Sequence, residues 1–155
     1  MIQRIQSVYL LLTTILSGLF LSGNLFSLTP GEASELVMNF RGIYRIAGES
    51  NPVLIGRIIP FSLISCLIPL VALVSIFFFK KRNLQLKLTL ALIILELLLV
   101  AAGAIDSFHF IRKFDASLSP AFRMFIPFLT LTLSILAYRG IRNDENLVRS
   151  YDRLR

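Results

Sequence analysis

Glu96 is the residue of this sequence whose type and position most strongly suggest chemistry, because it interrupts a Leu-rich run from Leu84 to Ile105. An acidic side chain near the centre of a bilayer costs about 2.5–3.5 kcal/mol on insertion scales, so it is a functional-site hypothesis by default. At 100° per residue, three polar or small residues lie within about 20° of Glu96 around the helix, namely Gln85, Thr89 and Gly103. We expect this polar or small stripe to face the interior of a helix bundle.

Three roles are open for Glu96. It could hydrogen-bond to a neighbouring helix and hold the two together. It could form an ion pair with Arg57, which lies one or two helical turns further out on the second apolar segment. It could also be the titrating group of a proton or ion path, although such a relay normally needs a chain of titratable groups. A polar site of Glu96, Arg57, Thr89 and Gln85 is therefore the candidate within the membrane.

Other reactive residue types are sparse. His109 is the only histidine, which excludes haem held by two histidines of one chain and argues against a histidine-rich metal site. Cys66 is the only cysteine, so an internal disulfide cannot form. The sequence also lacks a Gly-rich phosphate loop. We expect a non-enzymatic protein with no catalytic residue, metal or cofactor.

The composition indicates a membrane protein rather than a soluble domain. The 155 residues are 55% hydrophobic and only 16% charged, whereas soluble domains carry about 25% charged residues. The apolar residues form long segments at about 5–27, 53–79, 84–105 and 121–138. About 20 helical residues span the roughly 30 Å hydrocarbon core. The predicted fold is an all-α bundle of four transmembrane helices in one integral membrane domain, residues 1–155.

Two connections carry patterns of their own. Between the first two segments, turn residues flank a weak hairpin signal around Arg41-Gly42, so we expect a short outer loop or hairpin there. After the fourth segment, the charged tail 139–155 has apolar residues at helical spacing, namely Leu147, Val148, Tyr151 and Leu154. We expect a short amphipathic helix from near Asn143 to near Leu154, docked on the membrane surface or on a partner.

The positions of the basic residues predict the orientation. The formal net charge is +7, but the charges lie at the ends of the apolar segments, which argues against nucleic-acid binding. With both termini inside, ten Lys and Arg residues are cytoplasmic and six are outside. The compact turn Lys80-Lys81-Arg82 favours this orientation most strongly, since short loops count most. Both termini are therefore expected in the cytoplasm.

The same basic residues suggest a role. The candidate cytoplasmic interaction surface comprises Lys80, Lys81, Arg82, Arg149, Arg153 and Arg155. The leading hypothesis is an accessory or scaffold subunit that offers this face to a membrane-protein partner, a second copy of the chain, or anionic lipid. The alternative is a small transporter or ion-coupled channel that uses Glu96.

Three stretches of the sequence resemble a known family. They are the opening MIQRIQSVYLLL, the turn FFFKKRNLQLKL and the closing LAYRGIRNDENLVRSYDRLR. Together they resemble a family of small four-pass inner-membrane proteins of Bacteroidetes, catalogued as domain of unknown function 4293. The resemblance implies four spans and a bacterial inner membrane. It offers no activity to inherit, so no functional residue is carried over from it.

Overall fold

The structure of the chain is a computed structural model that describes residues 3–29, 34–47, 52–79, 81–114 and 117–152. Within these residues the helices are α1 (Gln3–Leu21), α2 (Ile59–Phe77), α3 (Arg82–Phe114) and α4 (Ile126–Asp152), the last preceded by the short 3-10 helix η1 (Phe122–Phe125). The strands are β1 (Asn24–Thr29), β2 (Ser34–Asn39), β3 (Gly42–Ala47), β4 (Val53–Gly56) and β5 (Ser117–Pro120).

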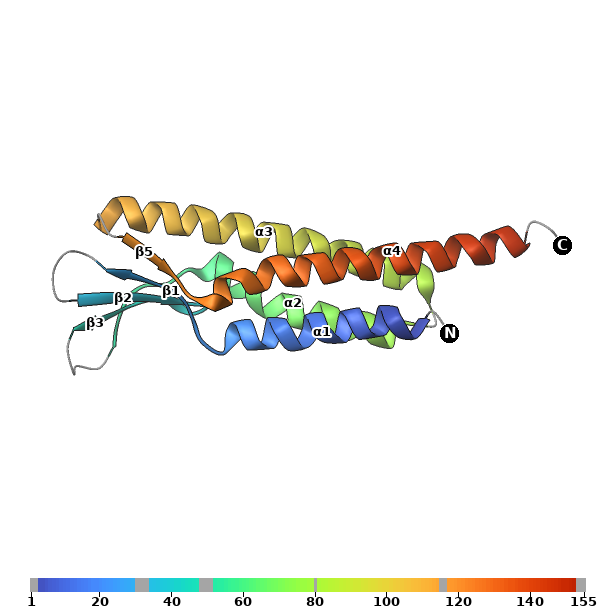
Figure 1. The fold of residues 1–155 in the computed structure, drawn as a ribbon, viewed down its shortest axis with the longest axis horizontal. Helices are drawn as coiled ribbons and strands as arrows, with labels where there is room; N and C mark the ends of the chain where they lie inside the picture. The colour runs from blue at the N-terminus through green and yellow to red at the C-terminus, as the bar shows by residue number, and fades with distance from the viewer. Residues whose placement is uncertain (1–2, 30–33, 48–51, 80, 115–116, 153–155) are drawn as a thin grey trace.

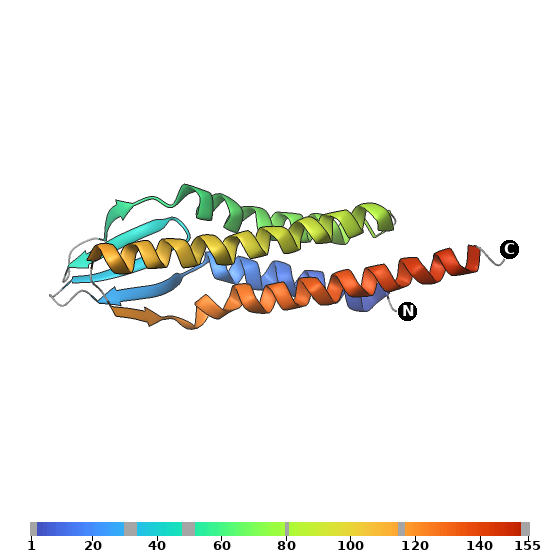
Figure 2. The ribbon, with the colours of Figure 1, turned by 90° about the horizontal axis from the view of Figure 1, so that it is seen from above.

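The four helices lie side by side in an elongated bundle (Figure 1). Helix α1 packs against α2 and α4, and α3 packs against the same two helices. The strands gather at one end of the bundle, whereas both chain ends and the turn between α2 and α3 lie at the other end (Figures 1 and 2). Four helices are present as expected, but the expectation of an all-α fold is wrong because a sheet is joined to them.

The sheet is antiparallel, with its five strands in the order β4-β3-β2-β1-β5. The predicted hairpin is confirmed as β2 and β3, which pair from Ser34–Ala47 down to Asn39–Gly42. The Asn39 Oδ1 accepts hydrogen bonds from the backbone N–H groups of Arg41 (2.9 Å) and Gly42 (3.2 Å), which closes this turn. The remaining strands extend the hairpin well beyond the short loop that we expected.

Two of the predicted helix boundaries on the sheet side are wrong because strands occupy the ends of the apolar segments. The first helix ends at Leu21 rather than near residue 27, since β1 begins at Asn24. The second begins at Ile59 rather than at residue 53, since Val53–Gly56 forms β4.

The other two boundary errors have the opposite sense, because helices continue past the apolar segments. Helix α3 runs to Phe114 rather than ending at residue 105, so His109 lies on the helix. Helix α4 runs without a break to Asp152, where we expected a separate tail helix. The end of α3 lies along the sheet in both views (Figures 1 and 2).

The surface of the bundle is apolar and its interior is partly polar. On α2, for example, Leu63 and Leu70 are each 60% exposed, whereas Ser65 and Ser75 are buried. A protein in water would reverse this arrangement. Three helical stretches are long and apolar enough to cross a bilayer, at 59–77, 82–113 and 122–146, and the apolar part of α1, Ile5–Leu21, is shorter. The chain is therefore a membrane protein with an apolar outer surface.

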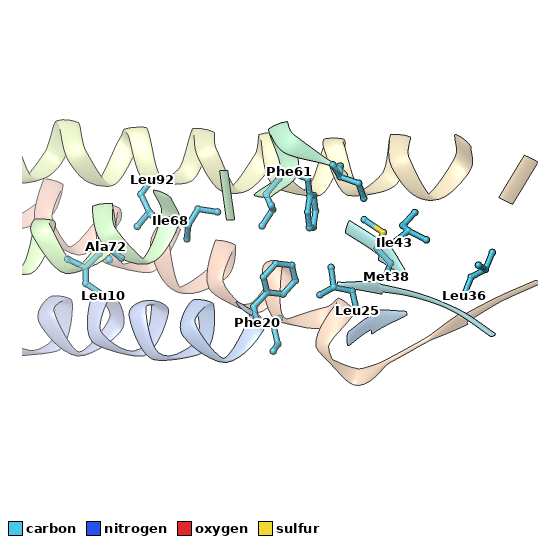
Figure 3. Close-up of a cluster of buried hydrophobic side chains, with 14 residues drawn as sticks. Leu10, Phe20, Leu25, Leu36, Met38, Ile43, Phe61, Ile68, Ala72 and Leu92 are labelled. Atoms are coloured by element: carbon cyan, nitrogen blue, oxygen red, sulfur yellow. The ribbon is translucent and has the colours of Figure 1, made fainter. Parts of the chain in front are cut away.

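The sheet and the bundle share a hydrophobic core at their junction (Figure 3). The Phe20 and Phe61 rings lie with their centroids 6.2 Å apart, beside the buried side chains of Leu25, Met38 and Ile43 from the sheet. This core anchors the sheet to the end of the helices, so the two parts form one unit.

Candidate functional site

Glu96 lies at the centre of the bundle, where α3 faces α4. Its side chain is 0% exposed, and its Oε1 accepts a hydrogen bond of 3.1 Å from the Ser134 Oγ of α4. Its Oε2 is also buried and has no hydrogen-bond partner among the described residues. The prediction that Glu96 faces the interior and meets a polar group of another helix is confirmed.

Ser134 was not identified from the sequence, and its hydrogen bond distinguishes it from other buried hydroxyls. The hydroxyls of Thr13, Ser65 and Thr89 donate to backbone carbonyls one turn earlier on their own helices. The Ser134 hydroxyl instead crosses to α3. Thr130 lies one turn before Ser134 on α4 and is also buried, which places a second hydroxyl beside the Glu96 carboxyl group.

Arg57 does not join Glu96, so the ion-pair interpretation is wrong. Arg57 is exposed in the link between β4 and α2, at the sheet end of the molecule. Because residues 53–56 form a strand instead of the first turn of a helix, Arg57 stays at the edge of the bundle. The polar partner of Glu96 comes from α4 rather than from α2.

Gln85 and Thr89 lie on the same buried face of α3 as Glu96, as the helical spacing predicted. Gln85 is 4% exposed and Thr89 is 0% exposed, and the Thr89 hydroxyl donates to the Gln85 carbonyl at 2.8 Å. All four helices add small polar residues to the interior. We call this set the polar seam, and its members are Gln6, Thr13, Ser17, Ser65, Ser75, Gln85, Thr89, Glu96, Thr130 and Ser134.

The polar seam ends in a contact between α1 and α4, near the chain ends. The Gln6 Nε2 donates a hydrogen bond of 2.8 Å to the Asp144 Oδ2, and the Arg82 Nη1 donates to the Asp144 backbone carbonyl at 3.5 Å. Gly140 lets the helices approach, since a Cβ there would lie 2.9 Å from the Gln6 Cγ. Helical spacing alone did not identify this pair, because its members are 138 residues apart in the chain.

The candidate cytoplasmic surface is only partly described. At the turn between α2 and α3, Lys81 is exposed and Arg82 is half-buried. Arg149 belongs to α4, but its side chain is not among those that the structure describes. Lys80, Arg153 and Arg155 lie outside the described residues. The tail is helical as expected, but it does not form a separate helix, because it continues α4 to Asp152.

Comparison with known proteins places the chain in a family without assigning an activity. Within the described residues, no group of three or more His, Cys, Asp or Glu side chains is placed to hold a metal ion. No curated protein matches the chain. The profile of one family, described as a domain of unknown function (DUF4293), matches residues 2–154. The chain belongs to the family of domain of unknown function 4293.

Proposed function

We propose that the protein crosses the inner membrane of a bacterium four times, with both termini in the cytoplasm. The proposal counts α1 as a span, although it is shorter than the other three. Its 19 residues reach about 28 Å, close to the hydrocarbon thickness. Leu11 and Ile15 on α1 are about half exposed and suited to lipid. An even number of spans also agrees with the position of both chain ends at one end of the bundle (Figure 1).

Within that arrangement, the protein acts as a non-enzymatic accessory or scaffold subunit. The observation that carries this proposal is the projection of α4 beyond the other helices on the side of the termini (Figures 1 and 2). Its 27 residues reach about 40 Å, which exceeds a hydrocarbon core of roughly 30 Å by about two helical turns. A projecting helix beside the basic turn at Lys81 and Arg82 is a docking element for a membrane-protein partner.

The interior supports a structural role for the polar seam. The void lined by Ser17, Ser65 and Thr130 has a volume of about 10 Å³, which is about the space of one water-sized probe. Most of the hydroxyls described above are satisfied by their own helix backbones. Short polar side chains of this kind let helices approach closely and join them by hydrogen bonds in lipid. The polar seam thereby fixes how the four helices pack.

One observation favours a second function, ion-coupled transport through Glu96. A fully buried carboxyl oxygen, the Glu96 Oε2, lacks a hydrogen-bond partner among the described residues, and buried acidic groups within membrane-spanning helices often mark proton paths.

Purification in mild detergent followed by mass spectrometry distinguishes the accessory subunit from the transporter. A stable co-purifying membrane protein supports the accessory subunit. Proton uptake by proteoliposomes of the purified chain supports the transporter.

Reversing the charge of the tail should release such a partner. We expect the triple variant Arg149→Glu, Arg153→Glu, Arg155→Glu to retain roughly one tenth or less of the co-purifying partner, because rim charges guide and hold complementary surfaces. Membrane insertion should not change, since these residues follow the last span. Quantitative mass spectrometry of the affinity-purified chain measures both effects.

A matched triple variant at the other end of the molecule is the control. Arg41, Arg45 and Arg57 are exposed at the sheet end, so their replacement by Glu changes the net charge equally. This control should keep the partner at the wild-type level. Retention of the partner by the tail variant, or an equal loss in the control, would refute the proposed docking face.

A further inference from the structure

A groove runs between the first turns of α3 and the later turns of α4, on the side of the chain ends. It has a volume of about 360 Å³ and is open to the outside. Its lining combines charged, amide and apolar side chains, namely Asn83, Leu86, Lys87, Leu90, Tyr138, Arg142, Glu145 and Asn146. This mixture differs from the uncharged lining of the interior void at Ser17, Ser65 and Thr130 and from the apolar outer surface of the helices.

The polar part of the groove offers donors from two helices. Lys87 on α3 and Arg142 on α4 are both exposed, and no hydrogen bond or ion pair joins either cation to the residues that the structure describes. Asn83 and Asn146 add amide donors. With Glu145 as the one acid of the lining, positive charge exceeds negative charge. A phosphate group suits this set, since it accepts hydrogen bonds and carries negative charge.

The apolar part of the groove lies deeper along α3. Lys87 is five residues into the helix, about 8 Å from its start. The long side chain of a lysine at that depth can extend along the helix and place its ammonium group at the level of the lipid headgroups. Leu90 follows about one turn later and is 46% exposed. The groove therefore changes from cationic to apolar in the direction in which a phospholipid changes from headgroup to acyl chain.

We infer that this groove binds an anionic phospholipid of the bilayer, with the phosphate between Lys87 and Arg142 and a chain against Leu90. Basic pockets between membrane-spanning helices bind anionic headgroups in this way. The inference rests on the proposed spanning arrangement, since it needs Lys87 at the membrane edge, and it names a lipid partner for the terminus-side face. The apolar continuation favours a lipid over a free phosphate ion.

Native mass spectrometry of the full chain tests the inference with phosphatidylglycerol and phosphatidylcholine as probes. The wild-type protein, released from mixed nanodiscs, should retain phosphatidylglycerol in preference to phosphatidylcholine. The Lys87→Gln variant should lower this retention about fivefold and the double variant Lys87→Gln, Arg142→Gln roughly twentyfold. Arg139→Gln is the control, because Arg139 is exposed on α4 but does not line the groove. Excess glycerol phosphate should not displace the lipid.

Three results would overturn the inference. The wild-type protein could show no preference for phosphatidylglycerol, Arg139→Gln could lose as much lipid as Lys87→Gln, or glycerol phosphate could displace the lipid and thereby identify a free-anion site. Circular dichroism confirms that each variant keeps its helices before it is compared. Failure of the lipid inference can be distinguished from failure of the proposed docking role, because the two are tested on different variants. Partner retention is measured on the tail variant, in which Lys87 and Arg142 are unchanged.

Discussion

Ala137→Leu should destabilise the helix bundle by about 1–3 kcal/mol. Ala137 is 0% exposed on the inner face of α4, in the turn after Ser134. A leucine there adds three carbon atoms to a packed interface and forces α4 away from its neighbours, because small residues are what allow helices to approach in lipid. The free energy of unfolding, measured by steric trapping in bicelles, gives the effect directly.

The same substitution on the lipid-facing side is the control. Ala91 lies on the exposed face of α3, where a leucine meets lipid rather than another helix. We expect Ala91→Leu to change the free energy of unfolding by no more than about 0.5 kcal/mol. An equal loss in the two variants would show that the outer face of α3 is packed against something other than lipid.

Glu96→Lys should destabilise the bundle by about 3–5 kcal/mol, whereas Glu96→Gln should cost less than about 1 kcal/mol. A lysine would place a cation among the Ser134 and Thr130 hydroxyls with no acidic partner. A glutamine keeps a carbonyl oxygen for the Ser134 hydroxyl, so the contact between α3 and α4 survives. Steric trapping of the two variants under one condition gives the difference.

The outcome for Glu96→Gln separates the roles of this residue. If it were as damaging as Glu96→Lys, Glu96 would have to be charged and paired with a cation, which would contradict the contact with Ser134. The transporter alternative makes a different prediction, since the glutamine variant would stay folded and lose proton uptake in proteoliposomes. An accessory subunit would show no uptake in either form and would keep its partner.

The interior stripe of α3 could be predicted from the sequence for a simple physical reason. Lipid accepts leucine but not a carboxylic acid, so the polar positions of an apolar helix must turn inward. Spacing at 100° per residue then places Gln85, Thr89 and Glu96 on one face, and all three are buried. The partner on α4 could not be predicted, because helical spacing does not say which depth of one helix meets which depth of another.

The sheet was harder to predict because its strands lack a distinctive pattern. Leu25 and Phe26 of β1 continue the apolar run of α1, and residues 53–56 of β4 adjoin the apolar run of α2. A short apolar run does not distinguish a strand from a helix. Strand β5, with the sequence SLSP, pairs with β1 from about 90 residues away, and no local signal encodes that pairing.

The ends of α3 and α4 show that a helix boundary differs from a membrane boundary. The predicted helix ended with the apolar segment at residue 105, but the charged residues Arg112 and Lys113 still lie in the last turn of α3. Cations there meet water and the negative end of the helix dipole, so the helix can continue beyond the lipid. Apolar composition therefore predicted the spans but not the full lengths of these helices.

Cysteine accessibility in spheroplasts tests most directly the central claim, that four spans place the sheet outside and both termini inside. In a Cys66→Ser background, single cysteines replace Val53, which is 64% exposed in the sheet, and Asn83, which is exposed in the first turn of α3. A third cysteine is carried by an N-terminal tag.

We expect a membrane-impermeant maleimide to label the cysteine at position 53 in intact spheroplasts. The cysteine at position 83 and the tag should be labelled only after lysis. Labelling of the tag together with position 53 before lysis would mean that α1 does not cross the membrane, and it would contradict the four-span arrangement.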